Sequence, residues 1–254
     1  MDYKKMIAMA GALACVSAFA VESANVVGYA PSALKSGNTA AGAQFVPMTD
    51  DSIDLANLTV VGYEEEQGGD IYVQRVDGKG KMIAGSQYFW YDIPDDSLYG
   101  WYDGSDEPLV AGTQTVKVGE GWWIKGTATT EGIQSSGQVA NAPIQVNLMN
   151  GNKFIVNPTP VAVNFNDDDN NGKFIAVGGY TEEQGGDIYV QQVDGKGKMV
   201  AGTQYFWYDI PADELYGWYD GNDDPITGIS LPAGGALWVK GTSTDEYISF
   251  PSAL

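Results

Sequence analysis

The sequence predicts an all-β protein made of two tandem, homologous domains of the β-sandwich or jelly-roll type that follow a cleaved signal peptide. A stretch of 47 residues, Gly62 to Pro108, recurs as Gly179 to Pro225 with eight substitutions, and a repeat of this length and spacing indicates whole domains. Within each copy, runs rich in aromatic and β-branched residues alternate with Gly, Asp and Pro, which is typical of antiparallel strands and turns. No window after residue 20 shows helical periodicity.

Residues 1–20 have the features of a secretory signal peptide. Lys4 and Lys5 precede an apolar run over 6–16, and Ala18-Phe19-Ala20 is a small-x-small cleavage pattern. The apolar run is shorter than the roughly 20 residues that a membrane span needs, and no other segment is a candidate. We therefore expect a protein that is secreted or held at the cell surface, without a transmembrane segment. Lipid attachment at Cys15 is the alternative.

Domain 1 is expected to cover residues 21–138, and its strands follow from alternation and turn signals. An extended N-terminal strand lies within 21–34 and ends near Pro31. Asp77-Gly78 predicts the hairpin turn between the first two strands of the repeat. The strands expected after the N-terminal one are 58–63, 70–76, 81–93, 98–102, 113–118 and 122–125.

The long strand at 81–93 carries aromatic side chains on both faces. Gln87, Phe89 and Tyr91 point to one side, and Tyr88 and Trp90 point to the other. We expect one face to pack on the core and the other to be covered or to bind a ligand.

Domain 2 is expected to cover residues 139–254, after a linker near 132–138. Its closing strand at 237–241, Leu-Trp-Val-Lys-Gly, matches Trp-Trp-Ile-Lys-Gly at 122–126 of domain 1.

The composition excludes much of enzyme chemistry. The chain contains no histidine, and its single cysteine lies in the signal peptide, so Ser-His-Asp triads, thiolate nucleophiles, disulfides and His-ligated zinc are ruled out. The net charge of −20 at pH 7 repels nucleic acid, which is not an expected partner. Paired carboxylates of a glycoside hydrolase are available by residue type alone, but nothing singles out two of them. We expect no enzyme.

Calcium is the one cofactor that the sequence suggests. Residues 167–172, DDDNNG, place oxygen ligands at alternate positions before a glycine, as calcium loops do, but Gly178 stands where an EF-hand has its bidentate Glu. The alternative is a solvated turn. Two repeated acidic loops offer weaker sites of the same kind, and the charged turn is the favoured interpretation there. The candidate calcium ligands are Asp167, Asp169, Asn171, Asp103, Asp106, Asp220 and Asp223.

The aromatic residues allow two interpretations. Exposed flat rings stack on sugars, and the same residues also build the cores of β-sandwiches. Core packing is favoured. If the sugar alternative holds, the stacking residues are expected to be Trp90, Trp101, Trp207 and Trp218.

The start ESANVVGY at 22–29, the Trp-Tyr-Asp-Gly turns at 101–104 and 218–221, and the closing strands with Gly-x-x-Trp-hydrophobic-Lys resemble a group of exported bacterial tandem β-domain proteins without assigned activity. The resemblance implies a surface or extracellular β-protein and carries over no catalytic residue. In organisation the chain is also similar to extracellular fibre subunits that lend a terminal strand to a neighbour.

These features lead to the hypothesis of an extracellular structural protein whose partner is itself. If the two domains meet at a true interface, the free ends of the chain resemble the two halves of that interface, and head-to-tail contacts then build a filament. The N-terminal strand would add to a neighbour's sheet edge. The alternative is a secreted carbohydrate-binding protein with two equivalent sites and a polysaccharide partner. The proposed assembly strand comprises Ala24, Asn25, Val26, Val27, Gly28 and Tyr29.

Overall fold

The computed structural model describes residues 27–33, 37–42, 52–63, 71–77, 82–128, 130–180, 188–193 and 199–253. The predicted all-β fold is confirmed. In the described ranges the helical elements are short 3-10 turns, η1 (Leu55–Asn57), η3 (Pro94–Asp96) and η5 (Pro211–Asp213). No helix of these ranges is long and apolar enough to cross a membrane. The predicted signal peptide lies outside the described residues.

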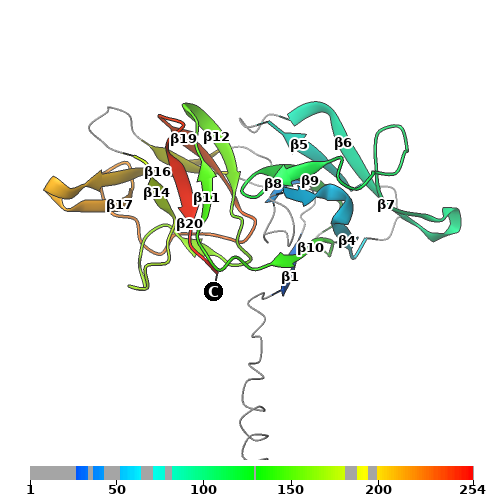
Figure 1. The fold of residues 1–254 in the computed structure, drawn as a ribbon, viewed down its shortest axis with the longest axis horizontal. Helices are drawn as coiled ribbons and strands as arrows, with labels where there is room; N and C mark the ends of the chain where they lie inside the picture. The colour runs from blue at the N-terminus through cyan, green and yellow to red at the C-terminus, as the bar shows by residue number, and fades with distance from the viewer. Residues whose placement is uncertain are drawn as a thin grey trace, which may run out of the picture.

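Domain 1 is built from three antiparallel sheets (Figure 1). Their strand orders are β2-β9-β5-β6-β7, β1-β10-β4 and β3-β8. The strands are β1 (Val27–Ala33), β2 (Gly37–Gly42), β3 (Ser52–Asp54), β4 (Thr59–Val61), β5 (Tyr72–Val76), β6 (Met82–Ile93), β7 (Leu98–Tyr102), β8 (Thr115–Lys117), β9 (Gly121–Gly126) and β10 (Gly132–Gln138).

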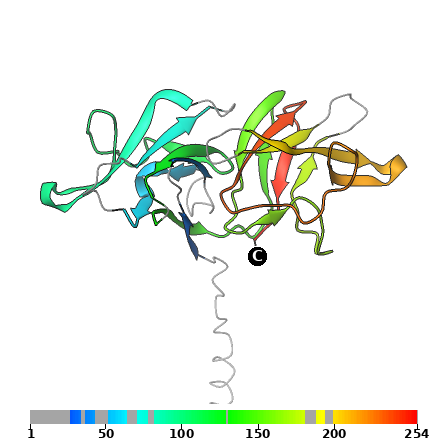
Figure 2. The ribbon, with the colours of Figure 1, turned by 180° about the vertical axis from the view of Figure 1, so that it is seen from behind.

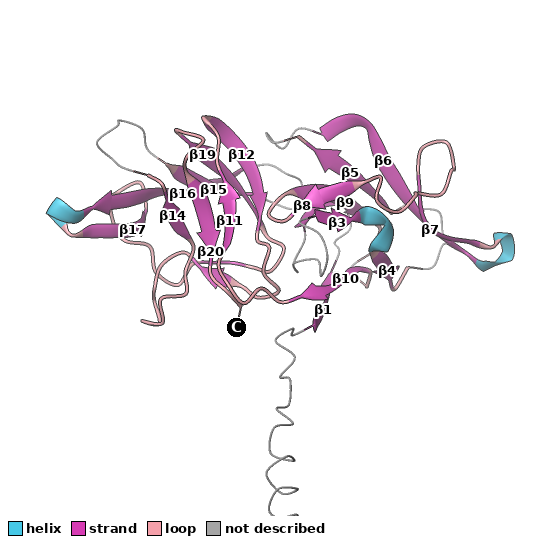
Figure 3. Ribbon diagram, viewed as in Figure 1, coloured by secondary structure: helices cyan, strands magenta, loops and turns pink. Residues whose placement is uncertain are grey.

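Domain 2 repeats these sheets with every strand number raised by ten. Its orders are β12-β19-β15-β16-β17, β11-β20-β14 and β13-β18. The strands are β11 (Ile144–Asn147), β12 (Gly151–Val156), β13 (Val163–Asn164), β14 (Ala176–Gly178), β15 (Tyr189–Val193), β16 (Met199–Ile210), β17 (Leu215–Tyr219), β18 (Ser230–Leu231), β19 (Ala236–Gly241) and β20 (Tyr247–Phe250). The hairpins β6–β7 and β16–β17 extend to opposite ends of the molecule, with η3 and η5 at their tips (Figures 2 and 3).

Each five-stranded sheet turns one face to the core of its own domain. In β6, Tyr88 and Trp90 are buried while Phe89 and Tyr91 are half-buried, so the alternation of the strand separates a core face from an outer face. Ile71 and Val73 of the neighbouring chain segment are fully buried against the same core. The buried cluster of domain 2 includes Phe165, Phe250 and Ile248.

The two domains meet at a seam formed by equivalent strands. Strand β12 lies against β2 and β9, and β2 is the counterpart of β12. The ring of Trp123 packs 5.5 Å from that of Phe154, whose other neighbour is Trp238 at 5.7 Å. The Val156 N–H donates to the carbonyl of Gly119 across the seam at 3.0 Å.

Lys153 on β12 lies beside the seam. Its ammonium donates to the carbonyl of Asn147 at 2.5 Å. Burial lowers the pKa of Lys153, and the charge of Glu120 from domain 1 opposes that change.

The structure differs from two predictions about the course of the chain. The predicted linker at 132–138 is instead strand β10, which pairs with both β1 and β4, and the strands of domain 2 begin at Ile144. The composition of this segment predicts a linker, but its Gly and Ser residues are accommodated in a strand that has a paired strand on each side. Of the proposed assembly strand, Val27, Gly28 and Tyr29 pair with β10 of their own domain. Ala24, Asn25 and Val26 lie outside the described residues.

Candidate functional site

The four tryptophans predicted as sugar-stacking residues lie in the two cores. Trp90, Trp101, Trp207 and Trp218 are 2, 3, 1 and 0% exposed. Each pair makes an edge-to-face contact, at 5.3 Å in domain 1 and 5.2 Å in domain 2. The indole N–H of Trp101 donates to the carbonyl of Leu58 at 2.8 Å. Core packing, the favoured interpretation, is therefore confirmed for these four residues, and the alternative of sugar stacking is wrong, because no ring face remains for a sugar.

A different set of aromatic residues lies on the outer face of the domain 1 sheet. Lys125, Tyr72, Phe89 and Tyr102 stand directly opposite one another on β9, β5, β6 and β7. The Lys125 ammonium lies 5.3 Å from the centre of the Tyr72 ring, and this ring lies 5.9 Å from Phe89. Tyr91 packs against Tyr102 at 4.9 Å. We call these five residues the domain 1 platform.

Domain 2 carries the same arrangement, which we call the domain 2 platform: Lys240, Tyr189, Phe206, Tyr208 and Tyr219. Lys240 lies 5.4 Å from the Tyr189 ring centre. The Tyr189–Phe206 and Tyr208–Tyr219 ring centres are 6.0 and 5.0 Å apart. As in domain 1, the members are half-buried except for the last tyrosine of the row, Tyr219, which is 8% exposed.

Glycine and aspartate set the position of the tyrosine at the edge of each platform. Gly100 stands opposite Tyr91 in the ladder and, with φ of 122° and no side chain, offers the ring no obstruction. The Tyr91 hydroxyl donates to Asp106 Oδ1 at 2.8 Å. In domain 2 the Tyr208 hydroxyl donates to Asp223 Oδ1 at 2.6 Å. Two predicted calcium ligands thus accept hydrogen bonds from platform tyrosines.

The other predicted ligands of the repeated loops close turns. Asp103 Oδ1 accepts from the Ser105 and Glu107 N–H groups at 2.8 and 3.2 Å. Asp220 Oδ1 accepts from the Asn222 and Asp224 N–H groups at 2.8 and 3.1 Å. These two backbone bonds hold the pKa of the Asp220 carboxyl below its ordinary value, as expected for a carboxylate that closes an Asx turn.

The calcium-like loop at 167–172 is divided between two roles. Asp167 Oδ1 accepts from the Asn171 and Gly172 N–H groups at 2.8 and 2.9 Å and so closes the turn. Asp169 and Asn171 instead line a pocket. Within the described ranges, no group of three or more acidic, His or Cys side chains is placed to hold a metal ion. Calcium binding stays a prediction, and these contacts support the solvated-turn alternative.

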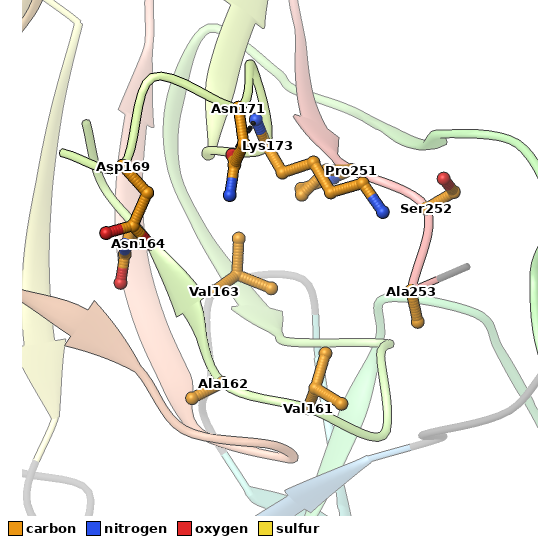
Figure 4. Close-up of a pocket in the computed structure, with 10 residues that line it drawn as sticks. All are labelled: Val161, Ala162, Val163, Asn164, Asp169, Asn171, Lys173, Pro251, Ser252 and Ala253. Atoms are coloured by element: carbon orange, nitrogen blue, oxygen red, sulfur yellow. Dashed lines mark hydrogen bonds between the residues drawn. The ribbon is translucent and has the colours of Figure 1, made fainter. Parts of the chain in front are cut away.

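The pocket lies in domain 2 and has a volume of about 240 Å³. Its walls come from the segment before and along β13, from the loop at 169–173 and from the segment after β20 (Figure 4). The apolar lining consists of Val161, Ala162, Val163, Pro251 and Ala253, and the polar lining of Asn164, Asp169, Asn171, Lys173 and Ser252.

Exposed tyrosines also mark the two projecting hairpins. Tyr99 and Tyr216 are 64 and 58% exposed, and each packs edge-on against the buried tryptophan beside it at 5.1 Å. Partial burial, and then the charge of Asp209, raises the pKa of Tyr216. These rings lie on the core side of their sheets and are separate from the platforms.

The sequence contains part of the signal for the platforms. Its alternation already assigned Phe89 and Tyr91 to one face. It did not show that Tyr72, Tyr102 and Lys125 join them, because this depends on the register of strands far apart in the chain. No family model matches the chain, and comparisons with curated proteins and with solved structures likewise found no match.

Proposed function

We propose that this chain is an exported, non-catalytic protein that binds neutral polysaccharide through the two platforms. One observation carries the proposal: the same row of rings and one lysine recurs on the outer face of both domains. A row that only stabilised the sheet would not need to stay half-open to solvent. Natural β-proteins usually place polar residues on an uncovered sheet face.

The chemistry of the platform suits a sugar ring. The C–H groups of a pyranose pack against aromatic faces, and the polar edge of tyrosine offers hydrogen bonds. Gln74 and Gln87 stand opposite each other in the next row of the same face, as Gln191 and Gln204 do in domain 2. Their amides provide donors and acceptors for hydroxyl groups.

The charge of the protein selects against anionic polymers. With a net charge of −20, the chain repels polyanions over the range of a Debye length, about 8 Å at physiological salt. One lysine on each platform does not offset this repulsion. Neutral glucans and mannans are therefore the preferred class.

The test is calorimetric titration of the mature protein with a panel of neutral oligosaccharides and polysaccharides. We expect two equivalent sites in the unmodified protein, one site in Phe89→Ala or Phe206→Ala, and no binding in the double variant. Tyr99→Ala is the matched control, since it removes an exposed ring from the opposite face. Unchanged binding by the double variant, loss in the control, or no binding of any neutral glycan would each refute the proposal.

Head-to-tail filament formation stays a prediction. Its premise is that the free ends resemble the two halves of the seam. At the seam, however, β12 of domain 2 lies against β2, which is its counterpart in domain 1. The described hairpins at the two ends of the molecule are copies of each other. Electron microscopy of the mature protein, with and without residues 21–34, tests this prediction directly.

A further inference from the structure

We propose that the bond between Asn171 and Gly172 is a site of spontaneous covalent modification, at which the asparagine loses ammonia through a succinimide ring. An Asn-Gly sequence occurs at two places in the chain, 150–151 and 171–172. Glycine in the second position has no side chain to obstruct attack by its own backbone nitrogen. At Gly172 the surroundings are open as well, because no described atom beyond its chain neighbours lies within 4 Å of an added Cβ.

The loop holds the side chain of Asn171 in position for this attack. Asn171 Oδ1 accepts a hydrogen bond from the Lys173 N–H at 2.8 Å, which makes an Asx turn. Such a turn folds the side-chain carbonyl back over the backbone nitrogen that lies between the two residues, here that of Gly172. The same N–H donor stabilises the negative charge that develops on Oδ1 when its carbon is attacked. Asn171 is exposed, so water can reach it and ammonia can leave.

The loop also places a base at the attacking nitrogen. The Gly172 N–H donates to Asp167 Oδ1 at 2.9 Å, within the reach that a general base requires. A second bond, from the Asn171 N–H at 2.8 Å, fixes this carboxylate oxygen. Because a peptide unit is planar, the proton lies in the plane toward Asp167 while the nitrogen attacks perpendicular to it. The two events therefore do not compete for the same direction.

The reaction needs only water as a co-reactant. The Gly172 nitrogen forms a bond to Asn171 Cγ as its proton passes to Asp167. The bond from Cγ to the amide nitrogen then breaks, and this nitrogen takes the proton back and leaves as ammonia. Water opens the succinimide at either carbonyl and gives aspartate or isoaspartate at position 171.

The product carries one more negative charge in the wall of the pocket, which Asn171 lines (Figure 4). The modification is confined to domain 2, because domain 1 lacks this loop. The buried residue before the loop and the carbonyl that accepts the tryptophan indole are Leu55 and Leu58 in domain 1, three positions apart. In domain 2 they are Phe165 and Ile175, ten positions apart.

The other Asn-Gly bond provides an internal comparison. Gly151 begins β12 and pairs with Gly241, and Asn150 forms a bridge to the same glycine. Ring closure at this bond would have to break that pairing. The fold should therefore favour the reaction at Asn171 and oppose it at Asn150.

The experiment follows the full mature chain over time at physiological pH and temperature by peptide mapping with mass spectrometry. Conversion of an amide to a carboxylate is read as a gain in mass, and isoaspartate is read by labelling with an isoaspartyl methyltransferase. We expect conversion in the folded chain to be at least about tenfold faster at Asn171 than at Asn150, since a positioned general base contributes about 10²–10⁴-fold. In urea the two bonds should react at similar rates, because both lose their folded surroundings.

Asp167→Asn tests the base, because the amide keeps an acceptor oxygen but does not take up the proton. It should slow conversion at Asn171 at least about tenfold. Asp169→Asn is the matched control, since it makes the same charge change in the loop and leaves the acceptor of the Gly172 N–H in place; it should leave the rate unchanged.

Three results would each overturn the proposal: conversion in the folded chain that is no faster at Asn171 than at Asn150, an unchanged or higher rate in Asp167→Asn, or an equal loss of rate in Asp169→Asn. None of these results bears on polysaccharide binding, which is measured with the platform variants.

Discussion

The two domains have the same sheets and the same platform, but they differ in the hydrogen bonds made by the backbone at the edge of the projecting hairpin. In domain 2, the Asn166 amide accepts from the Trp218 N–H at 2.8 Å and donates to the carbonyls of Trp218 and Ile226 at 2.8 and 2.7 Å. In domain 1, Ala56 follows Leu55 as Asn166 follows Phe165, and a methyl group makes no such bonds. One amide therefore binds the backbone of an edge strand in domain 2, and domain 1 has no amide at the equivalent position.

A second difference lies in the cores. Trp122 of domain 1 is buried, and its indole N–H has no hydrogen-bond partner within the part of the chain that the structure describes. Its counterpart in domain 2 is Leu237, which is fully buried and has no polar group. An unsatisfied buried donor costs about 1–3 kcal/mol. This difference favours domain 2 as the more stable copy, so similar sequences need not give domains of equal stability.

Asn166→Ala is expected to have the largest effect on the difference in stability between the two domains. It removes three hydrogen bonds, two with Trp218 of β17 and one with Ile226, each worth about 1 kcal/mol. We expect the free energy of unfolding of domain 2 to fall by about 3 kcal/mol, bringing its transition close to that of domain 1 in scanning calorimetry. Ala56→Asn is the control and should not lower the stability of domain 2. A change below about 0.5 kcal/mol in Asn166→Ala would contradict this role.

Gly119→Ala, a substitution at the seam, is expected to have the next largest effect on stability. A Cβ at Gly119 would lie 2.2 Å from Val146 Cγ2 of domain 2, and the residue has φ of +85°. We expect the free energy of unfolding to fall by about 2 kcal/mol because of backbone strain and overpacking. The two unfolding transitions should also lie further apart.

Gly112→Ala is the matched control for the seam. Its φ is +82° and nothing lies within 4 Å of the added Cβ, so it reports the backbone strain alone. Equal losses in the two variants would show that contact with Val146 does not hold the domains together.

The smallest expected effect is a difference between the two domains in the stability that each loses at alkaline pH. Burial raises the pKa of Tyr88 and of Tyr205 above the ordinary value of 10.0. A raised pKa in the folded state contributes stability that is present below pH 10 and is lost as the pH rises above it. The charge of Arg75 opposes the change at Tyr88, whereas Gln192 occupies the equivalent place in domain 2.

Domain 2 should therefore lose more stability than domain 1 above pH 10, by up to about 1.4 kcal/mol for each unit by which the two tyrosine pKa values differ. Denaturant titrations at pH 8 and pH 11 measure it. Tyr205→Phe should reduce the alkaline loss in domain 2, and Gln192→Arg should make domain 2 behave like domain 1. A larger alkaline loss in domain 1 would refute the assignment.

Part of the candidate site was accessible from the sequence. The alternation in β6 placed Phe89 and Tyr91 on one face, and the repeat implied that any site occurs twice. The tryptophans stay candidates for sugar stacking in the sequence, because chemistry alone does not tell a buried ring from an exposed one. The sequence predicts the aspartates as calcium ligands, because a loop whose carboxylates accept from its own backbone N–H groups has the same composition as one that binds a metal.

By itself, the sequence determined the all-β class, the duplication and most turns, because side-chain alternation and the chemistry of Gly, Asp and Pro act over a few neighbouring residues. Only the tertiary structure decided which ring faces point outward, how Lys125, Tyr72, Phe89 and Tyr102 align across four strands, and that 161–164, 169–173 and 251–253 enclose a pocket. The reason is physical. Strand register and loop packing between distant segments are set by burial and hydrogen bonding in the assembled sheets, and no local pattern contains that information.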